Sequence, residues 1–299
     1  MRSDHEMSVS VIVIGYAPAD LMERCLATLR DQSRGAPDVD ILAVAHASHQ
    51  GTPFAPVRSR FPDVRWIEAP GDHNIARMRG LGIARSSGEW VALLEGDCIP
   101  VPGWLAHVST VRPRAALGGA IEPGAFRRSL DWAAYFCEFS QFMPPLPAVP
   151  AQLPGSNVVY RRAALPAPER LEADGLFETF LNASLGQDAL QNDSALVVRH
   201  ARTWNAAAAM ATRFHHGRVF ASLRVRGAPV TRRAMYLPLA LALPLVLTAR
   251  VFRDVVRRRR HVVRALRAAP WIFALSAAWA AGELAGYAAG VGSSLDRWR

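Results

Sequence analysis

Residues 88–104, GEWVALLEGDCIPVPGW, run a short apolar segment straight into two acidic residues. The apolar run at residues 90–94 is bounded by turn-forming residues, a pattern typical of a buried strand in a parallel sheet. Glu95 and Asp97 follow at its carboxyl end, the edge at which open α/β sheets bind ligands. Two interpretations are open: the carboxylates hold a metal ion, or they form a polar turn that opens the next helix.

The residues before this strand alternate between strand-like and helix-like patterns. Apolar, β-branched runs predict strands at residues 8–16, 39–48 and 63–70, and apolar residues at helical spacing predict helices at 18–33 and 74–89. Strands that alternate with helices over short connections favour a parallel sheet covered on both faces. The first hundred residues are therefore predicted to form a doubly wound α/β unit.

The middle of the chain is less regular. The sequence predicts a strand at 116–123, a helix at 131–142, a strand, turn and helix start at 155–165, and a helix, turn and strand over 175–200. The turn in the last segment falls at Gly186, and its strand ends at His200. A Pro-rich loop at 143–154 is expected to lie over a site.

Composition limits the class of protein. A chain of 299 residues that is 51% hydrophobic can bury one large core or two modest ones, which excludes a disordered protein. The net charge is +10, every basic residue is Arg, and the acids after Arg199 are only Asp254, Glu283 and Asp296. Such a basic tail is expected to face an anionic surface, either a membrane or a nucleic acid. The three cysteines have no metal-like spacing, which favours a reducing compartment.

The tail itself contains two apolar stretches. Residues 234–249 are apolar but short for a membrane span and include two prolines, whereas residues 270–292 are long enough to cross a bilayer. Between them, residues 250–267 alternate aliphatic residues with Arg in a helical manner, which is typical of a basic amphipathic segment at a lipid surface. Because Arg is interleaved with aliphatic rather than stacking aromatic residues, lipid is the expected partner and nucleic acid is not.

The topology of the tail follows from its charge. A two-span hairpin would put the Arg-rich stretch on the side of the membrane opposite the α/β unit, against the tendency of Arg to stay cytoplasmic. The first apolar stretch is therefore expected to dip into the bilayer or lie flat on it. The alternative is a buried pair of helices.

Four motifs, in order, resemble those of glycosyltransferase family 2. They are VSVIVIGYAPADLMERCLATLRDQS at 9–33, RGLGIARSSGEWVALLEGDCIPVPGWL at 79–105, LPGSNVVYRRAAL at 153–165, and VVRH at 197–200 followed by GRVFASLR at 217–224. The resemblance covers about residues 8–224. It implies a GT-A (Rossmann-like), mostly parallel α/β sheet with helices on both faces, followed by a C-terminal hydrophobic helical segment.

The resemblance also implies a domain organisation and substrates. A glycosyltransferase-like domain would occupy residues 1–228, with a nucleotide-binding half at about 8–105 and an acceptor half at 106–228, and a membrane-associated helical region would follow at 229–299. The donor would be a nucleoside-diphosphate sugar and the acceptor a lipid-linked or other saccharide. The expected location is the cytoplasmic face of the cell membrane.

A sugar that leaves a nucleoside diphosphate builds negative charge on a phosphate oxygen, which a divalent cation, Mg or Mn, can neutralise. The resemblance makes Glu95, Asp97 and His200 the candidate ligands. His200 could complete the coordination or hydrogen-bond the diphosphate, or it is a strand-end histidine without a ligand. The candidate donor-binding residues are Gly15, Tyr16, His46, Arg79, Glu95, Ser156 and Asn157.

Inversion at the sugar carbon requires a base on the acceptor hydroxyl, opposite the leaving group. The family carries an acidic pair about twenty residues before its late His, and this position falls on Glu178 and Thr179. Glu178 is the preferred base, unless it is only an acid on a helix surface. A competing alignment on GQDAL makes Asp188 the base.

Arg79 is expected to grip a donor phosphate, or else to be a solvated charge on its helix. Several positions depart from the family pattern: Ala45 and His46 replace nucleotide-holding acids, Glu95 and Gly96 alter the acidic triplet, and Gly80 replaces a frequent Asn. These departures leave open a second function, that of a catalytically degenerate, membrane-attached binding protein on the same fold.

Overall fold

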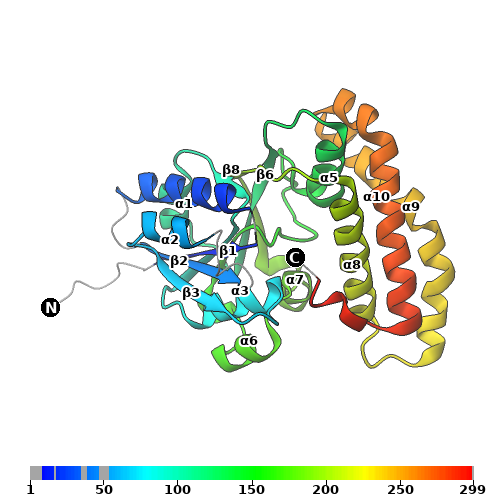
Figure 1. The fold of residues 1–299 in the computed structure, drawn as a ribbon, viewed down its shortest axis with the longest axis horizontal. Helices are drawn as coiled ribbons and strands as arrows, with labels where there is room; N and C mark the ends of the chain where they lie inside the picture. Colours follow the sequence, from blue (N-terminus) through cyan, green and yellow to red (C-terminus); the bar gives the residue numbers. More distant parts are fainter. Residues whose placement is uncertain (1–8, 17, 35–38, 47–53, 298–299) are drawn as a thin grey trace. The chain divides into compact units, whose positions relative to one another are not determined.

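The computed structural model describes residues 9–16, 18–34, 39–46 and 54–297 (Figure 1). It divides the chain into two compact units, one of Met1–Gly124 with Phe142–Arg202 and one of Ala125–Gln141 with Thr203–Arg299. The second of these units resumes after Arg202, because residues 206–224 form a helix that packs against the C-terminal helices.

The described residues of the first unit build one eight-stranded sheet in the order β3-β2-β1-β4-β7-β6-β8-β5. Its strands are β1 (Val9–Gly15), β2 (Val39–His46), β3 (Arg65–Ala69), β4 (Trp90–Glu95), β5 (Cys98–Pro100), β6 (Ala116–Pro123), β7 (Asn157–Arg161) and β8 (Leu190–His200). Strands β3, β2, β1 and β4 pair in parallel, whereas β7 is antiparallel to both β4 and β6. β6 pairs β8 in parallel and β5 closes the edge antiparallel to β8. The predicted α/β class is confirmed.

The helices of the first unit are α1 (Ala19–Ser33), α2 (Ala55–Arg60), α3 (Ile75–Ala84), α4 (Trp104–Thr110), α6 (Pro168–Asp174) and α7 (Glu178–Leu185). Helix α1 begins after Pro18 and buries Leu21, Cys25 and Leu29, which are the residues at helical spacing. The short elements α2, α4, α6 and β5 were not predicted, because segments of three to seven residues are too short to show a hydrophobic period.

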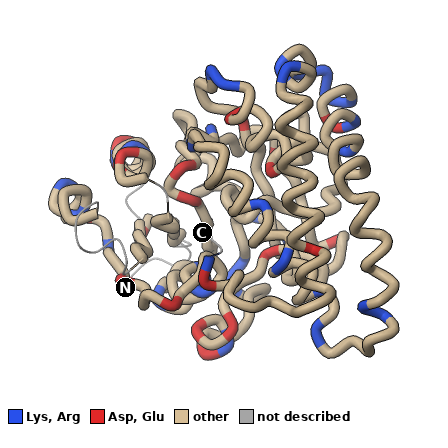
Figure 2. Tube along the Cα trace, turned by 45° about the vertical axis from the view of Figure 1, so that its right-hand side comes forward, with Lys and Arg blue, Asp and Glu red and all other residues tan. Residues whose placement is uncertain are grey.

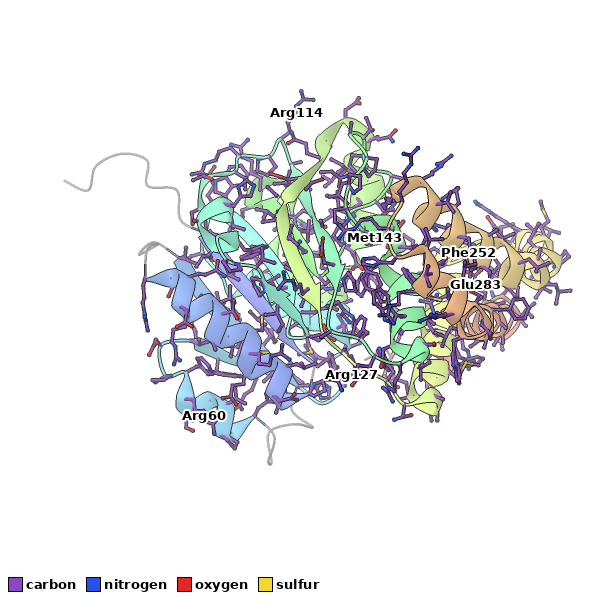
Figure 3. All side chains as sticks on the ribbon, turned by 90° about the horizontal axis from the view of Figure 1, so that it is seen from above. Arg60, Arg114, Arg127, Met143, Phe252 and Glu283 are labelled. Atoms are coloured by element: carbon purple, nitrogen blue, oxygen red, sulfur yellow. The ribbon has the colours of Figure 1, made fainter. Side chains whose placement is uncertain are left out.

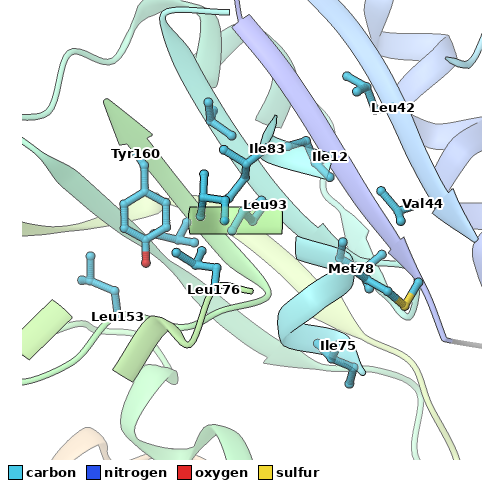
Figure 4. Close-up of a cluster of buried hydrophobic side chains, with 14 of the residues drawn as sticks. Ile12, Leu42, Val44, Ile75, Met78, Ile83, Leu93, Leu153, Tyr160 and Leu176 are labelled. Atoms are coloured by element: carbon cyan, nitrogen blue, oxygen red, sulfur yellow. The ribbon is translucent and has the colours of Figure 1, made fainter. Parts of the chain in front are cut away.

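A core cluster lies between the sheet and α3. Ile12, Leu42 and Leu93 come from three adjacent strands and are fully buried against Met78 and Ile83 of the helix (Figure 4). Gly82 allows this contact, because a Cβ there would lie 2.5 Å from Cγ2 of Ile12. The close packing fixes α3, and with it the side chain of its buried Arg79, over the carboxyl ends of the strands.

The second unit is helical. It contains α5 (Ser129–Phe139), α8 (Ala206–Arg224), α9 (Val230–Arg258) and α10 (Val262–Ala289). Helices α8 and α10 pack closely through glycines, since a Cβ at Gly217 would lie 2.3 Å from the carbonyl of Trp279 and one at Gly282 would lie 2.0 Å from that of Phe214. Glu283 of α10, labelled in Figure 3, is buried and accepts hydrogen bonds from Trp279 Nε1 and Tyr287 Oη, each at 2.7 Å.

The tail differs from the sequence expectation in two respects. Residues 234–249 are not a separate short segment but the middle of α9, a helix of 29 residues that includes Pro238 and Pro244. The Arg-rich stretch at 250–267 is not one segment either. It is interrupted by a turn in which Arg259 and His261 have positive φ angles of 52° and 56°, so its basic residues are divided between the end of α9 and the start of α10.

Candidate active site

The candidate site is built where the parallel strands end. The register places Gly15 beside Ala45 and Ile14 beside Glu95, so the carboxyl ends of β1, β2 and β4 lie at one edge of the sheet. Tyr16 follows directly after β1, and His46 is the last residue of β2. The strand register therefore places Gly15, His46 and Glu95 at the same edge of the sheet.

Arg79 joins two acidic residues at this edge. Its Nη2 donates a hydrogen bond of 2.6 Å to Oε1 of Glu95, and its Nη1 donates to Oε2 of Glu178. The side chain of Arg79 is 4% exposed, whereas those of Glu95 and Glu178 are 21% and 20% exposed. Burial alone would lower the pKa of Arg79, but the two carboxylates outweigh it and raise that pKa, so the guanidinium stays charged.

Local structure explains how these three residues meet. Asn74 caps α3 by accepting from the backbone N–H of Arg77, which fixes the start of the helix that carries Arg79. Glu178 is the first residue of α7, where a carboxylate is favoured by the positive end of the helix dipole. Arg79 is therefore not a solvated surface charge, and both of its terminal nitrogens donate to carboxylates.

Asp97 and His200 form a second polar pair. β5 pairs β8 so that Cys98 is opposite His200, and Asp97 Oδ2 lies 3.7 Å from His200 Nε2 and 3.9 Å from Arg202 Nη1. Asp97 is buried, and among the described residues its Oδ1 has no hydrogen-bond partner. Burial would raise the pKa of Asp97, but His200 and Arg202 outweigh this effect and hold the pKa below its usual value.

The predicted metal ligands are only partly assembled. Nowhere in the described part of the chain do three or more His, Cys, Asp or Glu residues form a group that could hold a metal ion. Asp97 and His200 are brought together, while Glu95 is paired with Arg79. A buried carboxylate with an unpartnered oxygen beside an imidazole fits two ligands of a divalent cation, and oxygen atoms of a diphosphate could supply others.

Two of the candidate donor-binding residues pack against one another with their rings tilted by 33°. The rings of Tyr16 and His46 lie 5.0 Å apart, and Tyr16 Oη donates a hydrogen bond to the carbonyl of His73. Both side chains are buried, at 8% and 1% exposure. Gly15 lies close to the backbone of β2, because a Cβ at this position would lie 3.0 Å from the carbonyl oxygen of Val44. These contacts place an aromatic pair at the end of β1 and β2.

The three residues of the Gly-Ser-Asn motif have different surroundings. Gly155 lies against the Arg79–Glu178 pair, Ser156 is 2% exposed, and Asn157 is completely buried. Asn157 accepts from Trp104 Nε1 at 3.0 Å, and its Nδ2 donates to the carbonyls of Ala120 and Leu196, each at 2.9 Å. These contacts favour a structural role for Asn157 in the sheet over direct contact with a donor.

Asp188 lies away from this edge. It is exposed in the short turn η4 (Gln187–Ala189) that precedes β8. β8 has 11 residues, which at about 3.3 Å per residue separates its two ends by about 30 Å, and His200 is at the far end. The contact of Glu178 with Arg79 makes Glu178 the acid that shares the edge with Glu95.

The sequence interpretation missed Gly155 and Arg202, and it treated Gly80 only as a departure from a family. A Cβ at Gly80 would lie 2.1 Å from the carbonyl oxygen of Leu171, so α3 and α6 approach too closely for the Asn that is frequent there. The Gly-Ser-Asn motif was a signal for Gly155. Arg202 had no signal, because its relation to Asp97 arises from strand pairing.

Comparisons with known proteins agree with this geometry. The family model of Glycosyl transferase family 2 matches residues 10–109. Glycosyltransferase AglE of Haloferax volcanii is 30% identical over 122 residues, a match that covers 38% of this chain and 39% of that relative. The chain thus spans about two fifths of the curated relative that it matches.

Among solved structures, mannosyltransferase PcManGT from Pyrobaculum calidifontis, in complex with GDP-Man and Mn2+, is similar in fold. The TM-score is 0.56 at 19% identity, and the alignment covers 94% of this chain and 88% of that one. The fold is that of the GT-A glycosyltransferases. Residues 10–109 of a chain with this fold are therefore similar to glycosyltransferase family 2.

Proposed function

We propose that this protein is an inverting, metal-assisted glycosyltransferase that moves a sugar from a nucleoside diphosphate to a saccharide or lipid-linked acceptor. The observation that carries the proposal is that Arg79 joins Glu178 to Glu95. Glu95 is two residues before Asp97, which pairs with His200. A base and a cation-binding pair at one sheet edge are the two elements that this chemistry requires. Support also comes from the shared fold with a mannosyltransferase that binds GDP-Man and Mn2+.

Asp97 and His200 are the residues that would hold the divalent cation. A bound Mg or Mn ion would neutralise the charge that develops on the departing diphosphate. Asp97 would use its unpartnered Oδ1, and the low pKa of this carboxyl keeps it ionised and ready to coordinate. Tyr16 and His46, at the ends of β1 and β2, would contact the nucleotide part of the donor.

Glu178 is the proposed base. The acceptor hydroxyl oxygen bonds to the anomeric carbon, the bond from that carbon to the diphosphate oxygen breaks, and the hydroxyl proton passes to Glu178. Because Oε2 of Glu178 is occupied by Arg79, Oε1 is the oxygen that takes the proton. Attack on the face opposite the leaving group inverts the sugar configuration.

The base is tested by Glu178→Gln with Asp188→Asn as the matched control. Sugar transfer should fall by about 10²–10⁴-fold in Glu178→Gln, because an amide cannot take up the proton, while nucleotide binding stays intact. Asp188→Asn should transfer sugar at the wild-type rate. Full activity in Glu178→Gln together with loss in Asp188→Asn would assign the base to Asp188.

Membrane attachment is a further part of the proposal, with the cytoplasmic face as the location. The described part of the chain contains two helices long and apolar enough to cross a membrane, α9 and α10. In its most apolar window α9 is only 11% buried, whereas α10 is 50% buried. A core helix of a soluble protein would bury its apolar residues, so the exposure of α9 favours lipid as its environment.

The alternative is a binding protein that keeps the fold without turnover. It is favoured by the altered acidic triplet, in which Glu95 forms an ion pair with Arg79. The two functions differ in one measurement. Nucleotide binding without release of a nucleoside diphosphate in the presence of any saccharide acceptor would support the binding protein.

A further inference from the structure

We infer that Arg79 is a positioning residue that holds the base Glu178 in place relative to the end of β4, and that Gly155 keeps room for this contact. The inference rests on the proposed function. In this inference Arg79 does not bind a donor phosphate but holds the base that acts on the acceptor hydroxyl.

The contacts of Arg79 connect distant parts of the chain. Glu95 is 16 residues and Glu178 is 99 residues from Arg79 in sequence, yet both accept from its guanidinium. The three residues come from α3, β4 and α7, so the ion pairs tie the start of α7 to the sheet. The backbone supports the same junction, because Leu176 N donates a hydrogen bond of 2.7 Å to the carbonyl of Ala76.

The bridge fits an arginine better than a lysine. The planar guanidinium presents several N–H groups in a fixed fork, whereas the ammonium of Lys is a single compact charge. Because Nη1 holds Glu178 and Nη2 holds Glu95, the single nitrogen of a Lys at position 79 would not reproduce the spacing of the two contacts. Two carboxylates around one guanidinium also leave a net charge of −1, which disfavours a phosphate at the same place.

Gly155 covers the bridge. A Cβ at this position would lie 2.6 Å from Arg79 Nη2 and 2.8 Å from Glu178 Cδ. Both atoms are at the ends of side chains that could move, but moving either one breaks an ion pair. Because Gly155 has no side chain, Arg79 and Glu178 have the room that their contact requires.

The first test is Arg79→Lys, with Arg77→Lys on the same helix as the control. Arg77 is partly exposed and forms an ion pair with Asp72 across 3.4 Å. If Arg79 positions the base, Arg79→Lys should lower kcat by about 100-fold with little change in the KM for the donor, because a small misplacement of a reacting group is that costly. A raised donor KM with an unchanged kcat would overturn the inference and return Arg79 to the donor phosphate.

A double-mutant cycle separates positioning from a general structural effect. Glu178→Asp keeps a carboxylate but shortens it, so that the contact with Arg79 is lost. If Arg79 acts through Glu178, adding Arg79→Lys to Glu178→Asp should cause no further loss of kcat. Losses that multiply would show that Arg79 supports the fold independently of the base.

Gly155→Ala gives a second route that leaves both charged residues in place, which matters if Arg79→Lys does not fold. It should lower kcat by a similar factor with the donor KM unchanged, while Gly71→Ala, where a Cβ would meet nothing within 4 Å, should behave as wild type. Wild-type kcat in Gly155→Ala would contradict the inference. A wild-type protein without any transferase activity would instead contradict the proposed function itself.

Discussion

Asn157 shows how strongly a single buried polar residue can be constrained. Its side chain is fully buried, and its amide joins Trp104 of α4 to the carbonyls of Ala120 and Leu196 in β6 and β8. Every partner is itself a polar group that would lose its hydrogen bond if Asn157 were removed. The position therefore links three neighbouring elements behind the candidate site.

Asn157→Ala should consequently lower the free energy of unfolding by about 3 kcal/mol or more, because each buried group left without a partner costs about 1–3 kcal/mol. Asn192→Ala is the control, since Asn192 makes an exposed hydrogen bond of 2.8 Å to the carbonyl of Pro147. Its cost should stay near 1 kcal/mol. Denaturant unfolding of the full chain measures both values, and equal values would refute the structural role of Asn157.

At the residue scale the sequence could place Glu95, Asp97, Tyr16 and His46 near one edge, because the ends of parallel strands are predictable from apolar runs. It could not predict the partners of Arg79. One of them, Glu178, lies at the start of α7, just after Gly175 and Leu176, whose backbone contacts Ala76 of α3. Sequence spacing carries no information on such contacts.

At the scale of elements, the contact between α3 and α6 depends on two glycines. A Cβ at Gly80 would lie 2.1 Å from the carbonyl oxygen of Leu171, and one at Gly175 would lie 2.6 Å from the carbonyl carbon of Ala76. These are contacts with backbone atoms, which cannot rotate away as a side chain can. The helix that carries Arg79 is therefore held at a short distance from α6.

Gly80→Ala should thus destabilise the protein by about 2 kcal/mol or more, through overpacking. The sign is informative, because Gly→Ala inside a helix ordinarily stabilises by about 0.5–1 kcal/mol. Thermal and denaturant unfolding of Gly80→Ala against Gly71→Ala measure the difference. A gain in stability for Gly80→Ala would mean that α3 and α6 are farther apart than described.

The long elements around the site were predictable and the short ones were not. β1, α1, β2, α3, β4 and β6 each contain an apolar run or apolar residues at helical spacing, and each lies near its predicted position. The three-residue β5 carries none, yet it brings Asp97 to His200 by pairing with the end of β8. The polar pair of the site therefore depends on an element that a sequence pattern cannot reveal.

At the scale of the whole molecule, the second unit differs from the first in what it exposes. Large apolar side chains of α9 are open to solvent, among them Met235 at 69%, Leu241 at 70% and Leu245 at 69%. Basic residues gather at the turn between α9 and α10, as the blue segments of Figure 2 show. An apolar face next to basic residues is typical of binding to an anionic lipid surface.

The double substitution Leu241→Glu and Leu245→Glu should therefore weaken binding to vesicles of phosphatidylcholine with phosphatidylserine, because charged residues are costly in the hydrocarbon region. Val149→Glu is the control, since Val149 is 61% exposed but lies in a loop of the first unit. Vesicle flotation measures the bound fraction. Equal binding by all three proteins would argue against α9 as the lipid-facing helix.

The central claim is that Asp97 and His200 form the metal-dependent donor site of a glycosyltransferase. Calorimetric titration of the full chain, solubilised in detergent, with a panel of nucleoside diphosphates and nucleotide sugars, with and without Mn2+, tests it most directly. The account predicts that at least one nucleotide binds with Mn2+, and that both removal of the metal and Asp97→Ala abolish this binding. Nucleotide binding that is unchanged without metal and in Asp97→Ala, or no binding across the whole panel, would contradict the account.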